Sequence, residues 1–340
     1  MSETTLDISV IICAYTEDRW DDLVAAIESV RQQTLSATEI IIVIDHNPQL
    51  QERVQNHIPD VIVVENSEAR GLRGARNCGV AVAKSQIIAF LDDDAVAIPD
   101  WLMFLTEGYT DPNVLGTGGA VTPFWVDNKP AWLPEEFYWV VGCTYRGMPQ
   151  TASTIRNPIG ANMSIRHEVF DTVGNFHSEI ERVGTQHAGG CEETELCIRA
   201  RQHWPQGVFL YQPQARVLHN VPGSRTRWRY FYSRCYVEGL AKAIVARHVG
   251  TKDSLASERI YTLRTLPRAT ARGLADALFR HDLTGLARAG AIVAGLAITT
   301  AGYFIGTILS QGITCRKAWT EVAIQRNSKT MPSIKAHSKV

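Results

Sequence analysis

Short runs of apolar residues alternate with helix-like segments through the first hundred residues of this 340-residue chain. The runs are rich in β-branched residues, as in strands that are covered on both faces. They span residues 8–13, 39–44, 61–64 and 86–91. Between them, residues 20–33 and 73–84 carry apolar side chains at helical spacing. Strands that alternate with helices predict an α/β fold with a mostly parallel, doubly wound sheet flanked by helices.

Three consecutive aspartates, Asp92, Asp93 and Asp94, follow the fourth apolar run. Ligands of such sheets bind beyond the carboxyl ends of the strands. Asp92 and Asp94 are separated by one residue, so their carboxylates form an oxygen-rich cup for Mg²⁺ or Mn²⁺, ions that usually complete their shell with substrate phosphates. The sequence therefore predicts a metal site for a nucleotide diphosphate, with a solvated acidic turn before a helix as the alternative.

The two parts of the chain differ strongly in charge. Residues 1–215 carry 14 Lys and Arg against 29 Asp and Glu, whereas residues 216–340 carry 20 against 6. A basic region beside an apolar segment favours membrane phospholipid as a partner. No RNP, zinc-finger or helix-turn-helix motif supports nucleic acid. The seven scattered cysteines form no CxxC pair, which predicts reduced thiols and a cytosolic setting.

Residues 289–315 contain no charged side chain and exceed the roughly 20 residues needed to span a bilayer. Positive charges lie on both sides of the segment, so they predict no orientation of the helix across a membrane. We expect a helix that is peripheral, re-entrant or crosses the membrane once. Upstream, apolar residues lie among arginines, as in an interfacial amphipathic helix. They are Leu255, Ile260, Leu263, Leu266, Leu274 and Leu278. The alternative is an ordinary helical subdomain packed on the sheet.

Six segments, in order, resemble glycosyltransferase family 2, whose nucleotide-binding half has the GT-A fold. They are "CAYTEDRW", "IDHNP", "ARGLRGARNCGVA", "FLDDDA", "NPIGANMSIRHEVFDTVGNF" and "GCEETELCIRA". The resemblance covers about residues 7–220 and implies a Rossmann-like GT-A domain over residues 1–220. We expect a helical, amphipathic to apolar, membrane-associated region over residues 221–315 and a basic, flexible tail over residues 316–340.

The resemblance also implies how the donor and the metal are bound. Asp92 and Asp94 match the family's DxD motif, with Asp94 the better metal ligand, and His219 matches a late histidine that GT-A enzymes supply to the metal. Arg225 and Arg227 are expected to close over the diphosphate, unless they form a membrane-facing stripe. The other expected donor contacts are Ala14, Tyr15, Asp45, Gly71, Arg73, Arg76, Asp92, Asp93 and Asn162.

Glu192 and Glu193 match the family's Glu-Asp pair, whose second member acts as general base in inverting enzymes. That member is Glu193, although its extra methylene leaves Glu192 open as the base. Without the resemblance, acidic residues are equally favoured at a helix N-terminus by the backbone dipole. The implied reaction is a single displacement at the anomeric carbon that inverts its configuration, with the metal stabilising the departing diphosphate.

The sequence thus predicts a metal-dependent inverting glycosyltransferase at the cytosolic membrane face. Its expected donor is a nucleotide sugar, with a UDP-sugar favoured, and its expected acceptor is a hydroxyl of a glycan or a lipid-linked sugar. A polyprenyl-phosphate sugar synthase is the close alternative. A non-catalytic membrane scaffold that binds nucleotide sugars is the alternative outside enzymes. A sugar-phosphate nucleotidyltransferase is disfavoured, because no Gly-rich loop with Pro-Lys follows the first strand.

Overall fold

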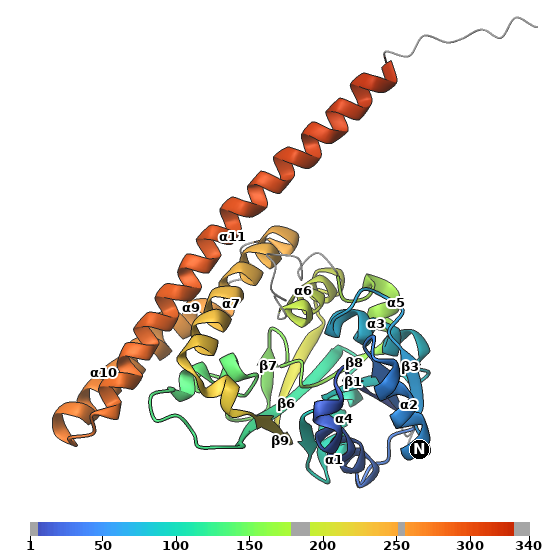
Figure 1. Ribbon diagram of the computed structural model, residues 1–340, viewed down its shortest axis with the longest axis horizontal. Helices are drawn as coiled ribbons and strands as arrows, with labels where there is room; N and C mark the ends of the chain where they lie inside the picture. The colour runs from blue at the N-terminus through green and yellow to red at the C-terminus, as the bar shows by residue number, and fades with distance from the viewer. Residues whose placement is uncertain (1–5, 178–190, 251–255, 330–340) are drawn as a thin grey trace, which may run out of the picture.

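The computed structural model describes residues 6–177, 191–250 and 256–329. Within them, nine strands form one sheet, in the order β3-β2-β1-β4-β8-β6-β9-β5, with β7 paired to β9 (Figure 1). The strands are β1 Ile8–Ala14, β2 Glu39–Ile44, β3 Ile62–Glu65, β4 Ile87–Asp92, β5 Ala95–Ala97, β6 Val114–Trp125, β7 Ser153–Ile155, β8 Asn162–Arg166 and β9 Val208–Val221.

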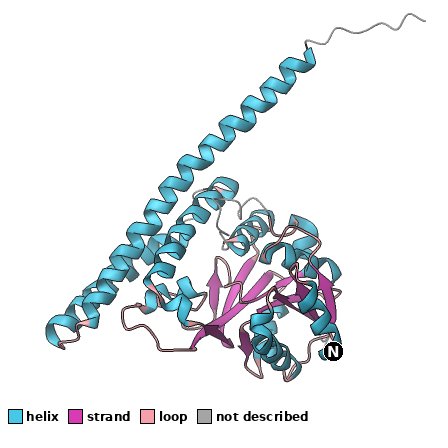
Figure 2. Ribbon diagram, viewed as in Figure 1, coloured by secondary structure: helices cyan, strands magenta, loops and turns pink. Residues whose placement is uncertain are grey.

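Helices lie against both faces of this sheet, and a long helix extends away from it (Figure 2). The α-helices are α1 Trp20–Arg31, α2 Pro48–His57, α3 Leu72–Val82, α4 Trp101–Thr106, α5 His167–Val173, α6 Glu192–His203, α7 Trp228–Val249, α9 Ala256–Ile260, α10 Leu266–Phe279 and α11 Thr284–Lys329. One turn of π-helix, η6 Tyr261–Thr265, joins α9 to α10.

The first half of the sheet confirms the predicted alternation of strand and helix. Strand β1 pairs in parallel with β2 and β4, and β2 pairs in parallel with β3. Side chains of β1 alternate between two buried clusters: Ile12 packs with α1, α2 and α4, whereas Ile11 packs with α3, α5 and α6. Six cysteines are free thiols: Cys13, Cys78, Cys143, Cys191, Cys197 and Cys235.

The second half adds antiparallel pairs that the apolar pattern does not predict. Strand β8 runs antiparallel to its neighbours β4 and β6, and β9 runs parallel to β6 but antiparallel to β5. Strand β5 has only three residues, and its pairing sets Ala95 opposite His219. The sheet is therefore mixed. Asp92 ends β4, and Asp93 and Asp94 form the short connection to β5.

The C-terminal region consists of α7, α9, α10 and α11, and α7 and α10 pack against α11. Within α11, the 26 residues Thr284–Leu309 are long and apolar enough to cross a membrane, by length and composition. Of the apolar residues predicted to face an interface, Leu266 is buried instead, and the exposed ones are Ile260, Leu263, Leu274 and Leu278. Leu255 lies outside the described residues.

Helix α11 continues through residue 316, where the basic tail is expected to begin, and ends at Lys329. Residues 330–340 lie outside the described part of the chain. The loss of apolar character at residue 316 does not end the helix. No Gly or Pro interrupts residues 316–329, so the backbone continues its hydrogen-bonding pattern through them.

Helices α7 and α11 approach closely at two glycines. A Cβ atom added at Gly302 would lie 2.3 Å from the Tyr236 carbonyl oxygen of α7, and one added at Gly239 would lie 2.1 Å from the Thr299 carbonyl oxygen of α11. Both distances are shorter than van der Waals contact. The crossing therefore depends on the absence of side chains at these two positions.

We expect Gly302→Ala to lower the thermal unfolding temperature of the protein in detergent, since overpacking typically costs about 1–3 kcal/mol. The matched control is Gly290→Ala on the same helix, where an added Cβ meets nothing within 4 Å. There the replacement should stabilise the helix by about 1 kcal/mol. Equal responses of the two variants in thermal unfolding would contradict the close crossing.

Candidate active site

A large cavity of about 1450 Å³ opens at the carboxyl ends of β1, β2 and β4. Asp92, Asp93 and Asp94, called here the acidic turn, line it, and so do Glu192 and Glu193 at the start of α6. The structure therefore brings together the two acidic clusters that the sequence places about a hundred residues apart. Other predicted site residues in its wall are Ala14, Tyr15, Asp45, Arg76, His219 and Arg225.

The antiparallel pairing of β5 with β9 brings His219 to the acidic turn. Its Nε2 lies 3.2 Å from Asp94 Oδ1. One ligand atom from each of Asp92, Asp94 and His219 lies within 4.8 Å of the other two. Two carboxylates and an imidazole form a donor set that fits a divalent cation such as Mn²⁺. The predicted metal ligands are thus adjacent in space.

Two arginines surround the acidic turn. Arg19 Nη1 lies 2.8 Å from Asp93 Oδ1 and 3.1 Å from Asp94 Oδ2, and Arg225 Nη2 lies 3.5 Å from Asp94 Oδ2. Burial alone would raise the pKa of Asp94, but the hydrogen bond from His219 and the nearby arginines outweigh it and hold that pKa at about 2. Asp94 is therefore ionised at neutral pH, as a metal ligand must be.

Asp93 differs from its neighbours. Burial raises the pKa of its carboxyl to about 7, against the opposing effect of Arg19. Its Oδ2 atom is buried and has no hydrogen-bond partner among the described residues. Because a buried polar oxygen without a partner is costly, the acidic turn is arranged for a group that the chain itself does not supply.

Arg76 connects the two acidic clusters. Its side chain is 3% exposed, with Nη2 3.5 Å from Asp92 Oδ1 and Nη1 3.3 Å from Glu192 Oε1. It also donates a hydrogen bond of 3.0 Å to the Gly160 carbonyl oxygen. A buried guanidinium between two carboxylates offsets their repulsion and fixes their spacing. The structure therefore gives Arg76 carboxylate partners in addition to its predicted place beside the donor.

Helix α6 positions the second acidic cluster. Cys191, with φ 78°, precedes the helix in a left-handed conformation, and Glu192 and Glu193 form its first turn. Burial raises the pKa of Glu193 to about 8, and the Glu192 carboxylate adds to the rise while Arg76 opposes it. A carboxylate with a pKa near the working pH is well suited to take a proton. Glu195 is instead ion-paired with Arg199 on the same helix.

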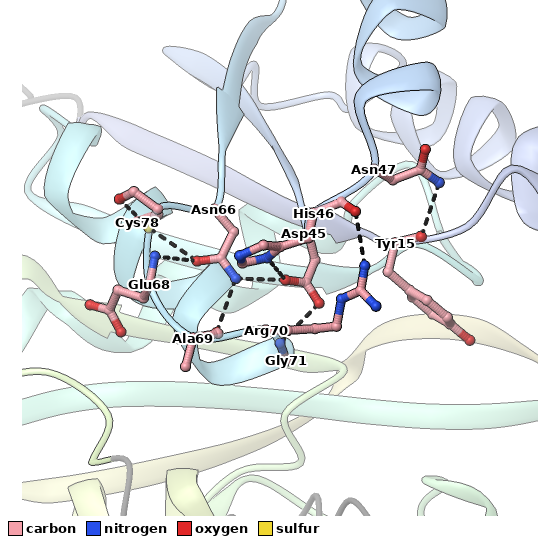
Figure 3. A network of polar contacts seen from close by, with 11 residues as sticks. Tyr15, Asp45, His46, Asn47, Asn66, Glu68, Ala69, Arg70, Gly71 and Cys78 are labelled. Carbon is pink, nitrogen blue, oxygen red and sulfur yellow. Dashed lines mark hydrogen bonds and ion pairs between the residues drawn. The ribbon is translucent and has the colours of Figure 1, made fainter.

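A hydrogen-bond network holds Asp45 at the end of β2 (Figure 3). Asn66 Nδ2 donates to Asp45 Oδ1 at 2.6 Å, and the Gly71 backbone N–H donates to Asp45 Oδ2 at 2.9 Å. Gly71 has φ 131°, a conformation that favours glycine. Asn47 Nδ2 donates to the Tyr15 carbonyl oxygen at 3.2 Å, which ties the loop after β1 to the same network.

Four predicted contacts do not line the cavity. Gly71 acts through Asp45, as described above. Arg73 is buried, and its Nη1 lies 3.5 Å from Glu68 Oε2. Arg227 is exposed and immediately precedes α7. The Asn162 side chain is fully buried and hydrogen-bonded to Trp101, Ala120 and Ala215, so it holds strands together and does not face the cavity.

The sequence reasoning missed other residues of the site. Arg19 lies in the segment "CAYTEDRW" after the first strand, and this position at the carboxyl end of a strand indicates a place beside the ligand. Asn66 follows β3, the strand next to β2, as Asp45 follows β2. Four further charged residues of the cavity wall had no recognisable pattern, because they come from three distant segments; they are Arg156, Glu238, Lys242 and Glu258.

Comparison with known proteins identifies the family. Residues 9–174 match the model for glycosyl transferase family 2. A glucosyl-dolichyl phosphate glucuronosyltransferase of Haloferax volcanii is 35% identical over 244 residues, which cover 71% of this chain and 77% of that protein. The chain belongs to glycosyltransferase family 2. The matched residues of this glycosyltransferase include the acidic turn, at the position where the family's DxD motif is expected.

Two further similarities are more limited. An Escherichia coli UDP-Glc:alpha-D-GlcNAc-diphosphoundecaprenol beta-1,3-glucosyltransferase is 39% identical over 89 residues, which cover 26% of this glycosyltransferase and 35% of that protein. The structure of a mannosyltransferase from Pyrobaculum calidifontis, in complex with GDP-Man and Mn²⁺, has a TM-score of 0.58 at 16% identity and covers 88% of both chains. The second similarity confirms the predicted GT-A fold.

Proposed function

We propose that this glycosyltransferase is metal-dependent and inverting. In this proposal it moves a sugar from a UDP-sugar to a hydroxyl group of a lipid-linked or free glycan at the cytosolic membrane face. The observation that carries the proposal is that one cavity is lined by both the Asp92, Asp94, His219 cluster and the Glu192, Glu193 pair. A single displacement needs both, one for the leaving group and one for the attacking hydroxyl.

Each cluster has its own part in the proposed reaction. Glu193 takes the proton of the acceptor hydroxyl. Burial raises the pKa of that base, and the Glu192 carboxylate adds to the rise while Arg76 opposes it. Arg19 and Arg225 add positive charge where the departing diphosphate gains negative charge. Asp92, Asp94 and His219 would hold a divalent cation, which when bound supplies further positive charge to the diphosphate oxygens. With one displacement, the anomeric configuration inverts.

The nucleoside end of the proposed site is formed by Ala14, Tyr15 and Asp45. Both Asp45 oxygens accept hydrogen bonds from the protein, so the carboxylate has a fixed orientation in the cavity wall. A fixed carboxylate is a selective partner for the N–H group of a base such as uracil. This supports a UDP-sugar donor, in keeping with the UDP-glucose named for the E. coli relative.

The acceptor and the membrane are proposed from two observations. The H. volcanii relative is named for a glucosyl-dolichyl phosphate acceptor, a sugar on a lipid carrier. Helix α11 contains a segment long and apolar enough to cross a membrane, and exposed leucines lie beside it on α10. A lipid-linked sugar offers a hydroxyl as nucleophile, which requires a base, and Glu193 supplies one.

Thermal unfolding in the presence of nucleotide sugars tests the donor site. We expect UDP-glucose or UDP-glucuronic acid with Mn²⁺ to raise the unfolding temperature, because a ligand that binds only the folded state stabilises it. Chelating the metal should abolish the shift, and GDP-mannose serves as the mismatched control. An equal shift with and without chelator would contradict metal-dependent donor binding.

A further inference from the structure

Part of the cavity remains after the donor site has been assigned. Ligand pockets usually measure about 300–1,000 Å³, and this cavity measures about 1450 Å³. The additional wall comes from the segment after β7, from α7, from the α9–η6 segment and from α11. A transferase must hold a second substrate beside its donor, and this wall has the position for it.

Four charged side chains from three segments meet in this wall, and we call them the charged tetrad: Arg156, Glu238, Lys242 and Glu258. Arg156 Nη1 donates to both carboxylate oxygens of Glu258, at 2.9 and 2.8 Å. Lys242 Nζ lies 2.6 Å from Glu258 Oε1 and 3.0 Å from Glu238 Oε1. Two cations and two anions give a formal net charge of zero.

Burying the four side chains of the charged tetrad costs more free energy than filling the same space with apolar residues would. Its side chains are only 14–21% exposed, and replacing such buried ion pairs by apolar residues is often neutral or stabilising. Burial opposes ionisation of Glu258, but its ion pairs with Lys242 and Arg156 outweigh burial and lower its pKa. The carboxylates therefore stay charged in the cavity wall, where they accept hydrogen bonds, and Lys242 donates them.

Aromatic rings lie beside the charged tetrad. The rings of Tyr145 and Tyr261 line the cavity and contact each other edge to face, with centroids 5.4 Å apart. Tyr261 is held in place by Trp139, whose Nε1 donates to its hydroxyl at 3.2 Å. Fixed acceptors, a fixed donor and an aromatic surface together match a sugar ring, which has hydroxyl groups on its edge and apolar faces.

The charged tetrad is also next to the proposed base. Glu238 Oε1 accepts a hydrogen bond from Cys191 Sγ at 3.6 Å, and Cys191 directly precedes Glu192 and Glu193. A sugar held by Glu238 and Lys242 therefore lies close to the first turn of α6. Its hydroxyl groups come within reach of the carboxylate that would remove a proton.

The same part of the cavity reaches helix α11. Leu296, Thr299, Thr300, Tyr303 and Phe304 line it, and all five lie in the segment that is long and apolar enough to cross a membrane. Leu296, Tyr303 and Phe304 therefore offer apolar contacts to a hydrocarbon chain attached to the bound sugar.

We propose that the charged tetrad binds the terminal, uncharged sugar of a lipid-linked acceptor, whose hydrocarbon part leaves along α11. This inference rests on the proposed glycosyl transfer, because it names the acceptor site of that reaction. Arg234 of α7 also lines the cavity and adds a positive charge near Glu238. An uncharged sugar is favoured because its hydroxyl groups find both donors and acceptors in the tetrad, whereas a carboxylate-bearing ring would also meet Glu238 and Glu258.

The test measures acceptor and donor separately in the full chain. Glu258→Gln and Lys242→Met are assayed with UDP-glucuronic acid, Mn²⁺ and glucosyl-dolichyl phosphate in detergent, and the binding of UDP with Mn²⁺ is measured by calorimetry. We expect each variant to raise the KM for the acceptor by at least about tenfold, the usual effect of losing one hydrogen bond to a charged group. The Kd for UDP should stay within twofold of the unchanged protein.

The matched control is Asp276→Asn, which removes a carboxylate ion-paired with Arg288 outside the cavity and should change neither value. If Glu258→Gln fails to fold, Glu258→Asp keeps the charge and shifts the carboxylate, with the same expected rise in KM. An unchanged acceptor KM, a parallel loss of UDP binding, or a preference for dolichyl phosphate without a sugar would overturn the inference. Failure of the unchanged protein to bind UDP with Mn²⁺ would instead reject the proposed function.

Discussion

Replacing Glu193 by Gln is expected to lower kcat for sugar transfer by about 100-fold to 10,000-fold, the usual contribution of a general base. The substitution keeps the size of the side chain and removes its ability to take a proton. Binding of UDP with Mn²⁺ should remain, because Glu193 belongs to the acceptor side of the proposed site. Steady-state kinetics and calorimetry on the same preparation check both expectations.

The pH dependence of kcat sharpens this prediction. Burial raises the pKa of Glu193 to about 8, and only the ionised carboxylate acts as a base. Turnover should therefore rise with pH until about 8, and this rise should disappear in Glu193→Gln. In Glu192→Gln the midpoint should move to lower pH, because the removed charge is one cause of the raised pKa.

The two glutamates can be told apart by these variants. If Glu192→Gln abolishes turnover while Glu193→Gln retains it, Glu192 is the base. If both variants keep nearly full turnover, no base is needed and the acceptor is already ionised. The second result would reject the hydroxyl acceptor and favour a polyprenyl-phosphate sugar synthase.

Asp94→Asn is expected to abolish metal-dependent donor binding. Asp94 is ionised at neutral pH and would offer a ligand oxygen beside His219, and an amide is a much weaker ligand for a divalent cation. The affinity for UDP in the presence of Mn²⁺ should fall by more than about 100-fold, since even changes outside the ligand shell cost about 10–100-fold. Transfer should become undetectable at ordinary substrate concentrations.

Asp93→Asn is the matched control for this substitution. Asp93 adjoins Asp94 in the acidic turn, but it does not contribute to the cluster of Asp92, Asp94 and His219. Mn²⁺ should therefore still increase the affinity of Asp93→Asn for UDP.

Circular dichroism checks the fold of Asp94→Asn, because Arg19 and Arg225 lose part of their compensating charge. A folded Asp94→Asn protein that binds UDP with Mn²⁺ as tightly as before would refute the metal site.

The sequence predicts most fully the features that depend on local pattern. Each of the first four strands lies within a residue of its apolar run. Strand β3 lies at the edge of the sheet and is partly exposed, in contrast to the expected cover on both faces. In β1, β2 and β4 the reason for the agreement is burial, because a strand covered on both faces has apolar residues at its centre. The acidic turn was predicted for the same reason, since it ends such a strand. The start of α6 at Glu192 agrees with its acidic first turn.

Features that depend on distant pairing were missed or misread. Arg156 and Glu258 are separated by 102 residues, and no periodicity connects them. The resemblance of its segment to the family implies a ligand contact for Asn162, yet its amide donates to carbonyl groups of two strands. Asn162 begins β8 opposite Leu91, next to the cavity, but its side chain is fully buried between strands, and the sequence alone does not reveal that orientation.

The contact between Gly302 and α7 has a practical consequence for making this protein. Removing the apolar C-terminal helix is a common way to obtain a membrane-associated enzyme in soluble form. Here such a shortened protein would lose Leu296, Tyr303 and Phe304 from the cavity wall and would leave the small-residue face of α7 uncovered. We therefore expect preparations that end before α11 to retain nucleotide binding and to lose transfer to lipid-linked sugars.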